Sequence, residues 1–191
     1  MDARRDNEPT PMKNPTTVQR ASDRELVVTR TFNGPARIVF TAWTTPELFR
    51  RWWLPKSMGM MLRSCAMDVR VGGTYRLEFE PDGMAFFGTY LEVTPPSRLV
   101  WTNEEGGEGG PVTTVTFEES GDQTLVVLRE LHASKDALDA AGTGAAEAMV
   151  ETFAQLDELL LTLSDTSYGP SDLQYQPHPR RLRRPPRGDR G

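Results

Sequence analysis

The sequence is poor in side chains that bind metals or form covalent crosslinks. It contains one cysteine, Cys65, and two histidines, His132 and His178. One cysteine cannot form an internal disulfide, and a structural zinc site needs several Cys or His ligands. The histidines have no metal-ligand spacing either. We therefore expect no disulfide and no metal, and we interpret Cys65 as a small, unreactive strand residue.

Long apolar runs are also absent. No stretch approaches the roughly 20 apolar residues that a helix needs to cross a bilayer. Residues 1–22 lack the apolar block of a signal peptide. We expect no membrane insertion and a cytoplasmic location.

Positive charge is scarce in the centre of the chain. The whole sequence has 22 Lys and Arg against 27 Asp and Glu, and residues 23–164 hold 12 of the basic and 21 of the acidic groups. Binding to phosphate backbones needs clustered positive charge on the folded surface, so we expect no nucleic-acid partner. The sequence also lacks a Gly-rich phosphate loop after a strand, a Ser-His-Asp arrangement and an acidic metal cluster. We expect no cofactor.

An amphipathic pattern near the C-terminus predicts a long helix over 142–163. Apolar residues recur there at spacings of four and three, which places them on one helix face. They are Met149, Phe153, Leu156, Leu160 and Leu163. The first half of the helix offers mostly Gly144, Ala145, Ala146 and Ala148. This small half indicates either close contact with a sheet or space for a ligand.

The rest of the folded part reads as strands and two short helices. Gly34-Pro35 ends a first strand and begins a helix, and Thr45-Pro46 begins a second, ending near Trp52. Alternating apolar residues and turn signals then predict a meander. The predicted strands are 24–32, 65–71, 74–80, 85–94, 98–103, 112–119 and 124–131. This order predicts an α+β fold, a curved antiparallel sheet of about seven strands around the long helix.

The two ends of the chain differ in composition from the centre. Residues 1–22 are polar, contain three prolines and show no periodicity. Residues 165–191 are rich in Pro and Arg. We predict a disordered arm over 1–22, one domain over 23–164 and a disordered tail over 165–191.

Several short motifs occur in an order typical of a known superfamily. They are Arg30-Thr31-Phe32-Asn33-Gly34-Pro35, Ala42-Trp43-Thr44-Thr45-Pro46-Glu47, Arg51-Trp52-Trp53-Leu54-Pro55, Met67-Asp68-Val69-Arg70-Val71-Gly72-Gly73, Gly88-Thr89-Tyr90 and Pro95-Pro96-Ser97-Arg98-Leu99-Val100. Over roughly 24–163 the chain resembles the SRPBCC, or START-like, superfamily, and most closely the family named for the activator of the heat-shock protein 90 ATPase.

The resemblance implies a helix-grip fold with a deep cavity between the sheet and the last helix. In many relatives this cavity holds an apolar or amphipathic small molecule. The chain departs from the pattern at Leu54, where relatives often have Gly, and at Ala148-Met149, where Gly followed by Trp or Met is common. We expect no counterpart of the extra N-terminal domain of the eukaryotic co-chaperone.

Aromatic and Met residues are the candidates for ligand contact, because flat rings and unbranched thioethers make adaptable apolar walls. The alternative is that they fill the core. Those nearest the proposed entrance are Trp52, Trp53, Met58, Met60 and Met61, and Trp43 is a further candidate. Period-two faces of the strands add Tyr75, Leu77, Phe79, Phe87 and Trp101, and the helix adds Met149 and Phe153.

Three polar residues are further candidates. Arg70 either pairs with Asp68 to fix a hairpin or holds a ligand carboxylate. Glu130 shares a strand face with Val126 and Leu128, so it is either a rim carboxylate or a buried acid-base group. His132 is either a solvated residue before the helix or a catalytic group.

Three functions follow from these observations. The first is binding of a small hydrophobic or amphipathic molecule. The second is an enzyme resembling polyketide cyclases or dehydratases that uses Glu130 and His132. The third, suggested by the family name alone, is chaperone modulation, for which we expect no binding to heat-shock protein 90. We expect a monomer or homodimer.

Overall fold

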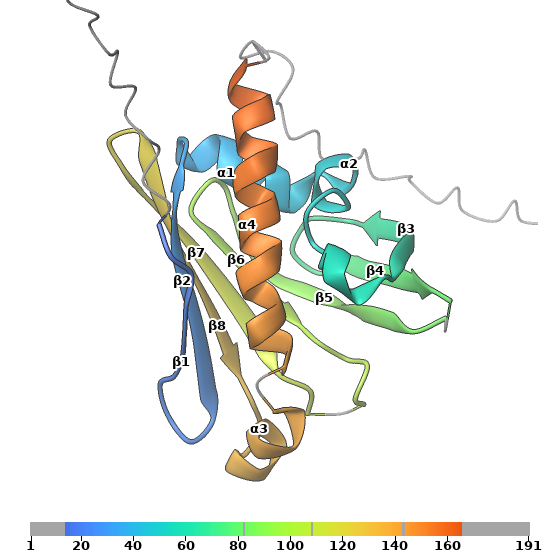
Figure 1. Cartoon of the computed structure of the whole chain (residues 1–191). Coiled ribbons are helices and arrows are strands. Elements are labelled where there is room, and N and C mark those ends of the chain that lie inside the picture. The colour runs from blue at the N-terminus through green and yellow to red at the C-terminus, as the bar shows by residue number, and fades with distance from the viewer. Residues whose placement is uncertain (1–13, 82, 108, 143, 166–191) are drawn as a thin grey trace, which may run out of the picture.

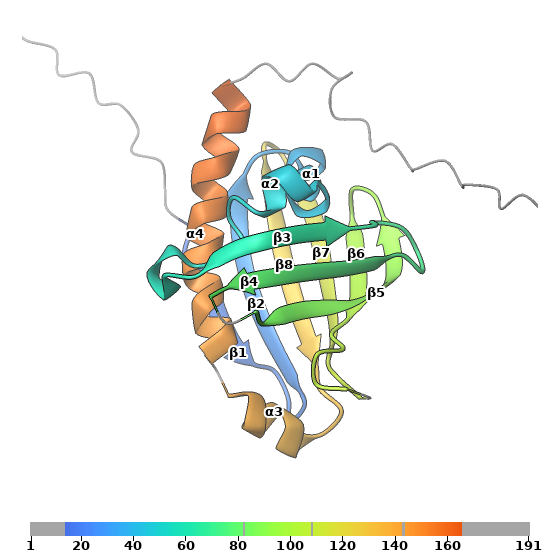
Figure 2. The ribbon, with the colours of Figure 1, turned by 90° about the vertical axis from the view of Figure 1, so that its right-hand side faces the viewer.

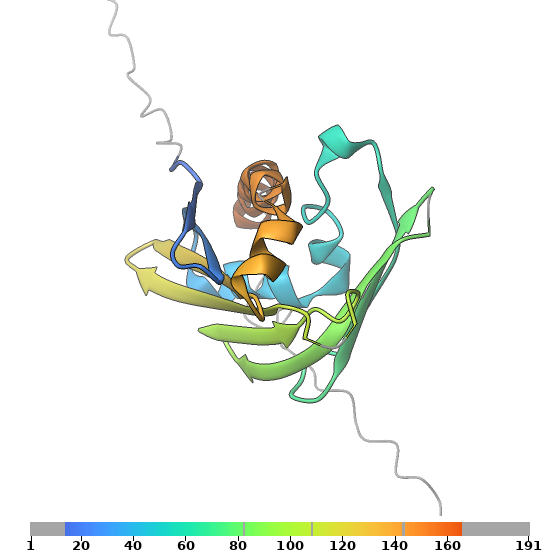
Figure 3. The ribbon, with the colours of Figure 1, turned by 90° about the horizontal axis from the view of Figure 1, so that it is seen from below.

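One antiparallel sheet curves around a long C-terminal helix (Figure 1; Figure 3). The computed structural model describes residues 14–81, 83–107, 109–142 and 144–165. Its strands are β1 (Thr17–Arg20), β2 (Glu25–Asn33), β3 (Met61–Met67), β4 (Thr74–Glu80), β5 (Ala85–Thr94), β6 (Arg98–Thr102), β7 (Val112–Ser120) and β8 (Gln123–Leu131). Its helices are α1 (Ala36–Thr44), α2 (Pro46–Phe49), the 3₁₀ helix η1 (Lys56–Met58), α3 (Lys135–Ala141) and α4 (Gly144–Asp165).

The sheet order is β1-β2-β8-β7-β6-β5-β4-β3. Strands β3 to β8 form a meander, and β8 then pairs with β2. Figure 2 shows β3, β4 and β5 lying crosswise to β2, β7 and β8. This change of direction curls the sheet into a trough, and α4 lies along it. The expected α+β helix-grip architecture is therefore confirmed.

The turn from β2 into α1 follows from its residues. Gly34 has a φ of 156°, a backbone conformation that glycine adopts readily. Pro35 precedes the first helical residue. The backbone N–H of Ala36 donates to the Glu119 carboxylate at 2.6 Å, which places a negative charge at the positive end of α1. Helix α1 is thereby fixed over one end of the trough.

Helix α4 buries the face that its sequence predicts. Phe153 and Leu156 are fully buried, and Leu160 and Leu163 are buried beside them. The ring of Phe153 meets Phe32 of β2 edge to face at 5.4 Å. Such pairs contribute about 1 kcal/mol beyond the area they bury. The C-terminal half of α4 is therefore the part that anchors the helix to the sheet.

Strand β1 corrects the expected boundary of the N-terminal arm. Thr17–Arg20 pairs with β2, so the sheet has eight strands and the folded part begins before residue 23. The pairing is an edge contact in which Val18 packs against the core. Such a short polar strand carries little periodicity from which it could be predicted. Residues 1–13 and 166–191 lie outside the described residues.

Strand β3 corrects a second boundary. It runs from Met61 to Met67, whereas 65–71 was predicted. The chain turns at Asp68, whose N–H donates to Thr74 O at 2.9 Å, and Val69 is buried against the core. A Cβ on Gly73 would lie 1.9 Å from Asp68 O, so only glycine allows this close approach.

Helix α3 was not predicted. Its start has an ordinary cap, since the Ser134 hydroxyl accepts the N–H of Ala137 at 3.1 Å. Gly142, with a φ of 68°, ends it. Within the part of the chain that the structure describes, we find no helix long and apolar enough to cross a membrane.

Candidate ligand-binding cavity

A cavity of about 670 Å³ lies between the inner face of the sheet and the N-terminal half of α4. This volume is within the range of about 300–1,000 Å³ that small-molecule sites occupy. Gly144 and Ala148 of α4 line it, together with Met149. Gly144 and Ala148 thus face the cavity, and Phe153, Leu156, Leu160 and Leu163 face the core.

The inner face of the sheet changes from apolar to polar along its strands. Val28, Leu128 and Leu99 lie in one cross-strand row. One step nearer α3, the next row contains Leu26, Glu130, Thr113, Trp101 and Tyr90. Members of both rows line the cavity. The cavity therefore has an apolar end and a polar end.

Large apolar side chains close the apolar end. Trp43 is buried and its ring lies 5.9 Å from that of Trp53. Leu77 and Phe79 of β4 line the opposite wall. Two lining methionines, Met58 and Met84, are 54% and 47% exposed, so the cavity reaches the surface beside them.

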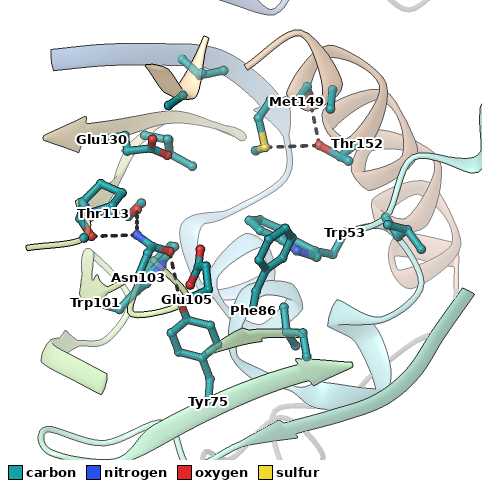
Figure 4. Close-up of a pocket in the computed structure, with 18 of the residues that line it drawn as sticks. Trp53, Tyr75, Phe86, Trp101, Asn103, Glu105, Thr113, Glu130, Met149 and Thr152 are labelled. Carbon is teal, nitrogen blue, oxygen red and sulfur yellow. Dashed lines mark hydrogen bonds between the residues drawn. The ribbon is translucent and has the colours of Figure 1, made fainter. Parts of the chain in front are cut away.

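The polar end is organised by Asn103. Its amide Nδ2 donates to Thr113 Oγ1 at 2.8 Å and to Pro111 O at 3.0 Å. Its Oδ1 lies 3.0 Å from the hydroxyl of Tyr75, which also approaches Thr102 O. Figure 4 shows Tyr75, Asn103 and Thr113 along one side of the cavity. The amide holds both hydroxyls in place at the cavity wall.

Two carboxylates lie at the same end. Glu130 of β8 is directly opposite Thr113, and Glu105 lies two positions after Asn103 in the chain. Burial raises the pKa of the Tyr75 phenol above its ordinary value, and Glu105 and Glu130 raise it further. Tyr75 is therefore protonated at neutral pH and donates its proton to the acceptors around it.

His132 forms the floor of the polar end. It is 4% exposed, and its Nε2 lies 2.6 Å from Glu130 Oε1, without the alignment of a hydrogen bond. Its backbone N–H donates to Arg24 O at 2.8 Å, which extends the β2–β8 pairing. Glu130 and His132 thus form a close acid-base pair that lines the cavity.

Trp43 carries an unmatched donor at the apolar end. Its Nε1 is buried and has no hydrogen-bond partner among the described residues. A buried N–H without a partner costs about 1–3 kcal/mol. By contrast, Trp52 Nε1 donates to Ala42 O at 3.0 Å.

The segment that covers one side of the cavity is held by α4. The Gln155 amide donates to Trp52 O at 2.8 Å and Leu54 O at 2.9 Å, and its Oε1 accepts the N–H of Lys56 at 3.0 Å. Glu151 accepts the N–H of Ser57 at 2.9 Å and its hydroxyl. These contacts position Trp53, whose ring Figure 4 places across the cavity from Asn103.

Most of the predicted ligand-contact residues line the cavity. They are Trp43, Trp53, Met58, Met60, Tyr75, Leu77, Phe79, Trp101 and Met149, together with the weaker candidates Glu130 and His132. This places them at one site and does not test whether they bind a ligand.

Four predicted residues are elsewhere. Trp52 and Phe153 are fully buried in the core and do not line the cavity. Arg70 pairs with Asp68 at 2.7 Å on the surface, as the alternative interpretation held. Phe87 lies beneath the guanidinium of Arg76, outside the cavity.

The error at Phe87 has a structural cause. Strand β5 has a register shift between Tyr90 and Glu92. A bulge reverses which alternate residues face inward. Before it, Phe86 and Tyr90 face the cavity, and beyond it Val93 packs against the core. An unbroken period of two across the strand therefore placed Phe87 on the wrong face.

Several lining residues were missed. Asn103, Glu105 and Thr113 lie in or beside a Gly-rich loop without a recognisable pattern, and Thr152 lies one position from the predicted helix stripe. Phe86 and Tyr90 could have been found by testing the second face of β5.

Cys65 lies in β3 and is partly buried. Burial raises the pKa of the Cys65 thiol to about 11, and the nearby Arg50 lowers it only in part. The thiol is therefore protonated and unreactive at neutral pH. Among the described residues, no group of three or more His, Cys, Asp or Glu side chains could hold a metal.

Solved structures share this fold. A protein from Rhodobacter sphaeroides matches with a TM-score of 0.69 and 23% identity over 78% of this chain and 99% of its own. A protein from Nitrosomonas europaea matches with a TM-score of 0.66 and 24% identity, over 76% and 99%. CalU16 from Micromonospora echinospora matches with a TM-score of 0.54 and 21% identity, over 80% and 90%.

Sequence comparison assigns the family. No curated protein matches the sequence significantly. The profile of the Activator of Hsp90 ATPase homolog 1-like protein family matches residues 33–161, which extend from the end of β2 into the last turns of α4. The chain therefore belongs to the family of activator of Hsp90 ATPase homolog 1-like proteins.

Proposed function

We propose that this protein binds a small hydrophobic or amphipathic molecule in the cavity between the sheet and α4. The observation that carries the proposal is the cavity of about 670 Å³, walled by aromatic, Met and Leu side chains with a few polar groups at one end. Apolar walls with a few placed polar groups are typical of small-molecule sites.

Two further features support ligand binding. The small residues of α4 keep the helix from filling the space above the sheet. The buried Nε1 of Trp43 has no partner among the described residues, so a ligand oxygen beside it would remove an unfavourable burial. The hydrophobic gain of burying apolar ligand surface is about 25 cal/mol per Å².

A cavity-filling variant tests the proposal. Ala148 lines the cavity, so Ala148→Trp should occupy it and weaken binding of the neutral apolar probe N-phenyl-1-naphthylamine by about tenfold or more. Val150 is 46% exposed on the same helix, and Val150→Trp is the matched control. Probe fluorescence is titrated after circular dichroism has shown that both variants are folded. The proposal fails if the natural protein does not bind the probe, or if Ala148→Trp binds it equally well.

A second function, catalysis resembling that of polyketide cyclases, is favoured by one observation. Glu130 and His132 both line the cavity and lie 2.6 Å apart, as an acid-base pair requires. Incubation with small polyketide-like substrates, followed by mass spectrometry, tests it. Product that forms with the natural protein and not with Glu130→Gln supports catalysis. Turnover that survives in Glu130→Gln excludes Glu130 as the acid or base.

A further inference from the structure

The charged groups at the polar end of the cavity point to the kind of ligand head group that fits there. Glu105 and Glu130 both line the cavity, and the other titratable groups there are the neutral phenols of Tyr75 and Tyr90 and the imidazole of His132. The described lining residues include no Lys or Arg. With two carboxylates and at most one positive charge, this end is net negative whether or not His132 is protonated.

Several of the remaining polar atoms at this end accept hydrogen bonds, and the Thr113 hydroxyl can also donate one. Thr113 Oγ1 and Asn103 Oδ1 are oxygens whose positions are set by the contacts described above. The Tyr75 hydroxyl directs its single proton toward Thr102 O and Asn103 Oδ1, which leaves its oxygen lone pairs as acceptors. The Asn103 amide protons are already directed at Thr113 and Pro111. A ligand group that donates hydrogen bonds therefore meets several partners.

The nearest basic side chains are directed elsewhere. Arg24 Nε donates to the backbone oxygen of His132 at 3.0 Å, and its side chain does not line the cavity. Lys135 pairs with Asp139 at 2.5 Å on the surface of α3. Arg129 lies 3.4 Å from Glu25, on the strand face opposite to Glu130. None of these three cations offsets Glu130 from within the cavity.

The N-terminus of α4 favours an anion. Gly144 is its first residue and lines the cavity. A helix N-terminus stabilises a negative charge by about 0.3–1 kcal/mol. Glu147 lies in the first turn and opposes this effect. Two full carboxylates therefore outweigh the helix dipole.

We infer that the cavity selects amphipathic molecules whose polar end donates hydrogen bonds or carries a positive charge, such as a protonated amine, over molecules ending in a carboxylate or phosphate. This inference rests on the proposed function. In the bound state the apolar part lies among Trp53, Leu77 and Phe79. The head group lies between Glu105, Glu130 and Thr113.

Three ligands that share one alkyl chain test the inference: decylamine, decanol and decanoate. Each is titrated against the complex with N-phenyl-1-naphthylamine at neutral pH and low salt. We expect decylamine to displace the probe at a concentration about tenfold lower than decanoate does, with decanol between them. We expect added salt to weaken decylamine and to leave decanol unchanged.

Charge-removing variants locate the effect. Glu130→Gln and Glu105→Gln should each reduce the preference for decylamine over decanoate, and the double variant should bring the ratio to within about twofold. Glu118→Gln, on an exposed end of β7 away from the cavity, is the matched control and should keep the natural ratio. The salt dependence of the natural protein provides the same test without any variant.

The outcomes separate this inference from the proposed function. Decanoate binding as tightly as decylamine, or a preference unchanged in the double variant, overturns the inference while ligand binding itself stands. Probe binding that none of the three ligands displaces also overturns it. Absence of probe binding to the natural protein overturns both.

Discussion

Arg30 is a buried charge on the inner face of β2, at the end of the sheet away from the acidic groups of the cavity. It is 8% exposed and pairs with Asp157 of α4, and its Nη1 donates to Thr16 Oγ1 at 2.9 Å. Its guanidinium also lies 5.6 Å from the ring centroid of Phe32. Burial raises the pKa of Asp157, although Arg30 lowers it. This pair ties the C-terminal half of α4 to β2.

We predict that Arg30→Met destabilises the protein by about 2 kcal/mol, because it leaves Asp157 without a partner. Part of this loss should be recovered in the double variant Arg30→Met/Asp157→Leu. A carboxyl whose folded pKa is raised contributes stability at low pH that is lost as the pH rises through that pKa. Because Arg30 lowers the pKa of Asp157, its removal raises this pKa further. The loss of stability caused by Arg30→Met should therefore be larger at about pH 7 than at about pH 4. Urea unfolding of the three proteins measures this. Equal losses at both pH values would contradict the role assigned to Asp157.

The segment between α2 and β3 forms one wall of the cavity and is attached to side chains of α4. The backbone of Trp52, Leu54 and Lys56 forms hydrogen bonds with the side chain of Gln155. Gln155 thus helps to position Trp53 and Met58, together with Glu151, which accepts the N–H of Ser57.

Gln155→Leu should lower the free energy of unfolding by about 2–3 kcal/mol, since it leaves three backbone groups without their partner. It should also speed dissociation of N-phenyl-1-naphthylamine, because the wall loses its attachment. Leu161→Ala, at a 60% exposed position of the same helix, is the control and should change neither quantity. Urea unfolding and stopped-flow dissociation give the two values. A variant with natural stability and dissociation rate would show that Glu151 alone holds the wall.

The molecule as a whole consists of a packed half and a hollow half. Strands β2, β7 and β8 rest at one end on a core that includes Phe32, Phe117 and Phe153 and line the cavity at the other end, whereas the inner faces of β4 and β5 mainly line the cavity. Strand β3 is the edge of the sheet and pairs only with β4. Apolar packing and paired neighbours on both sides make opening of a strand unfavourable.

Hydrogen exchange should therefore be slowest in β2, β7 and β8 and fastest in β1 and β3 among the strands. Addition of N-phenyl-1-naphthylamine should slow exchange in β4, β5 and residues 53–60, since these surround the ligand. Mass spectrometry of peptides from the natural protein measures both patterns, with residues 153–163 of α4, none of which lines the cavity, as the internal reference. If the probe slows exchange only in β1, which does not line the cavity, then the probe binds outside the cavity.

Elements with strong local signals were predictable. The stripe Phe153, Leu156, Leu160 and Leu163 determines a helix face whatever it packs against. Gly34-Pro35 and the turn between β7 and β8 need only local backbone chemistry. Strand β1 and helix α3 were not predicted, because one is a short polar edge and the other lies between two stronger signals.

The sequence predicted many of the residues that line the candidate site, but not how they are arranged around it. Tyr75, Leu77 and Phe79 share one face of β4 by a period of two, which holds in any regular strand. Phe87 was assigned wrongly because the bulge in β5 depends on pairing with β6. Asn103 and Glu105 come from a loop whose path depends on contacts with β7.

The sequence by itself determined the α+β order of elements, the buried face of α4 and the acidic balance of the central residues, because each depends on spacing or composition along the chain. Only the tertiary structure decided that space remains beneath the small half of α4 and that Glu105, Glu130 and Tyr75 meet at one end of it. These residues belong to different strands and a loop, and their distances are set by sheet curvature and register. Curvature and register arise from packing between segments distant in the chain, which no local pattern specifies.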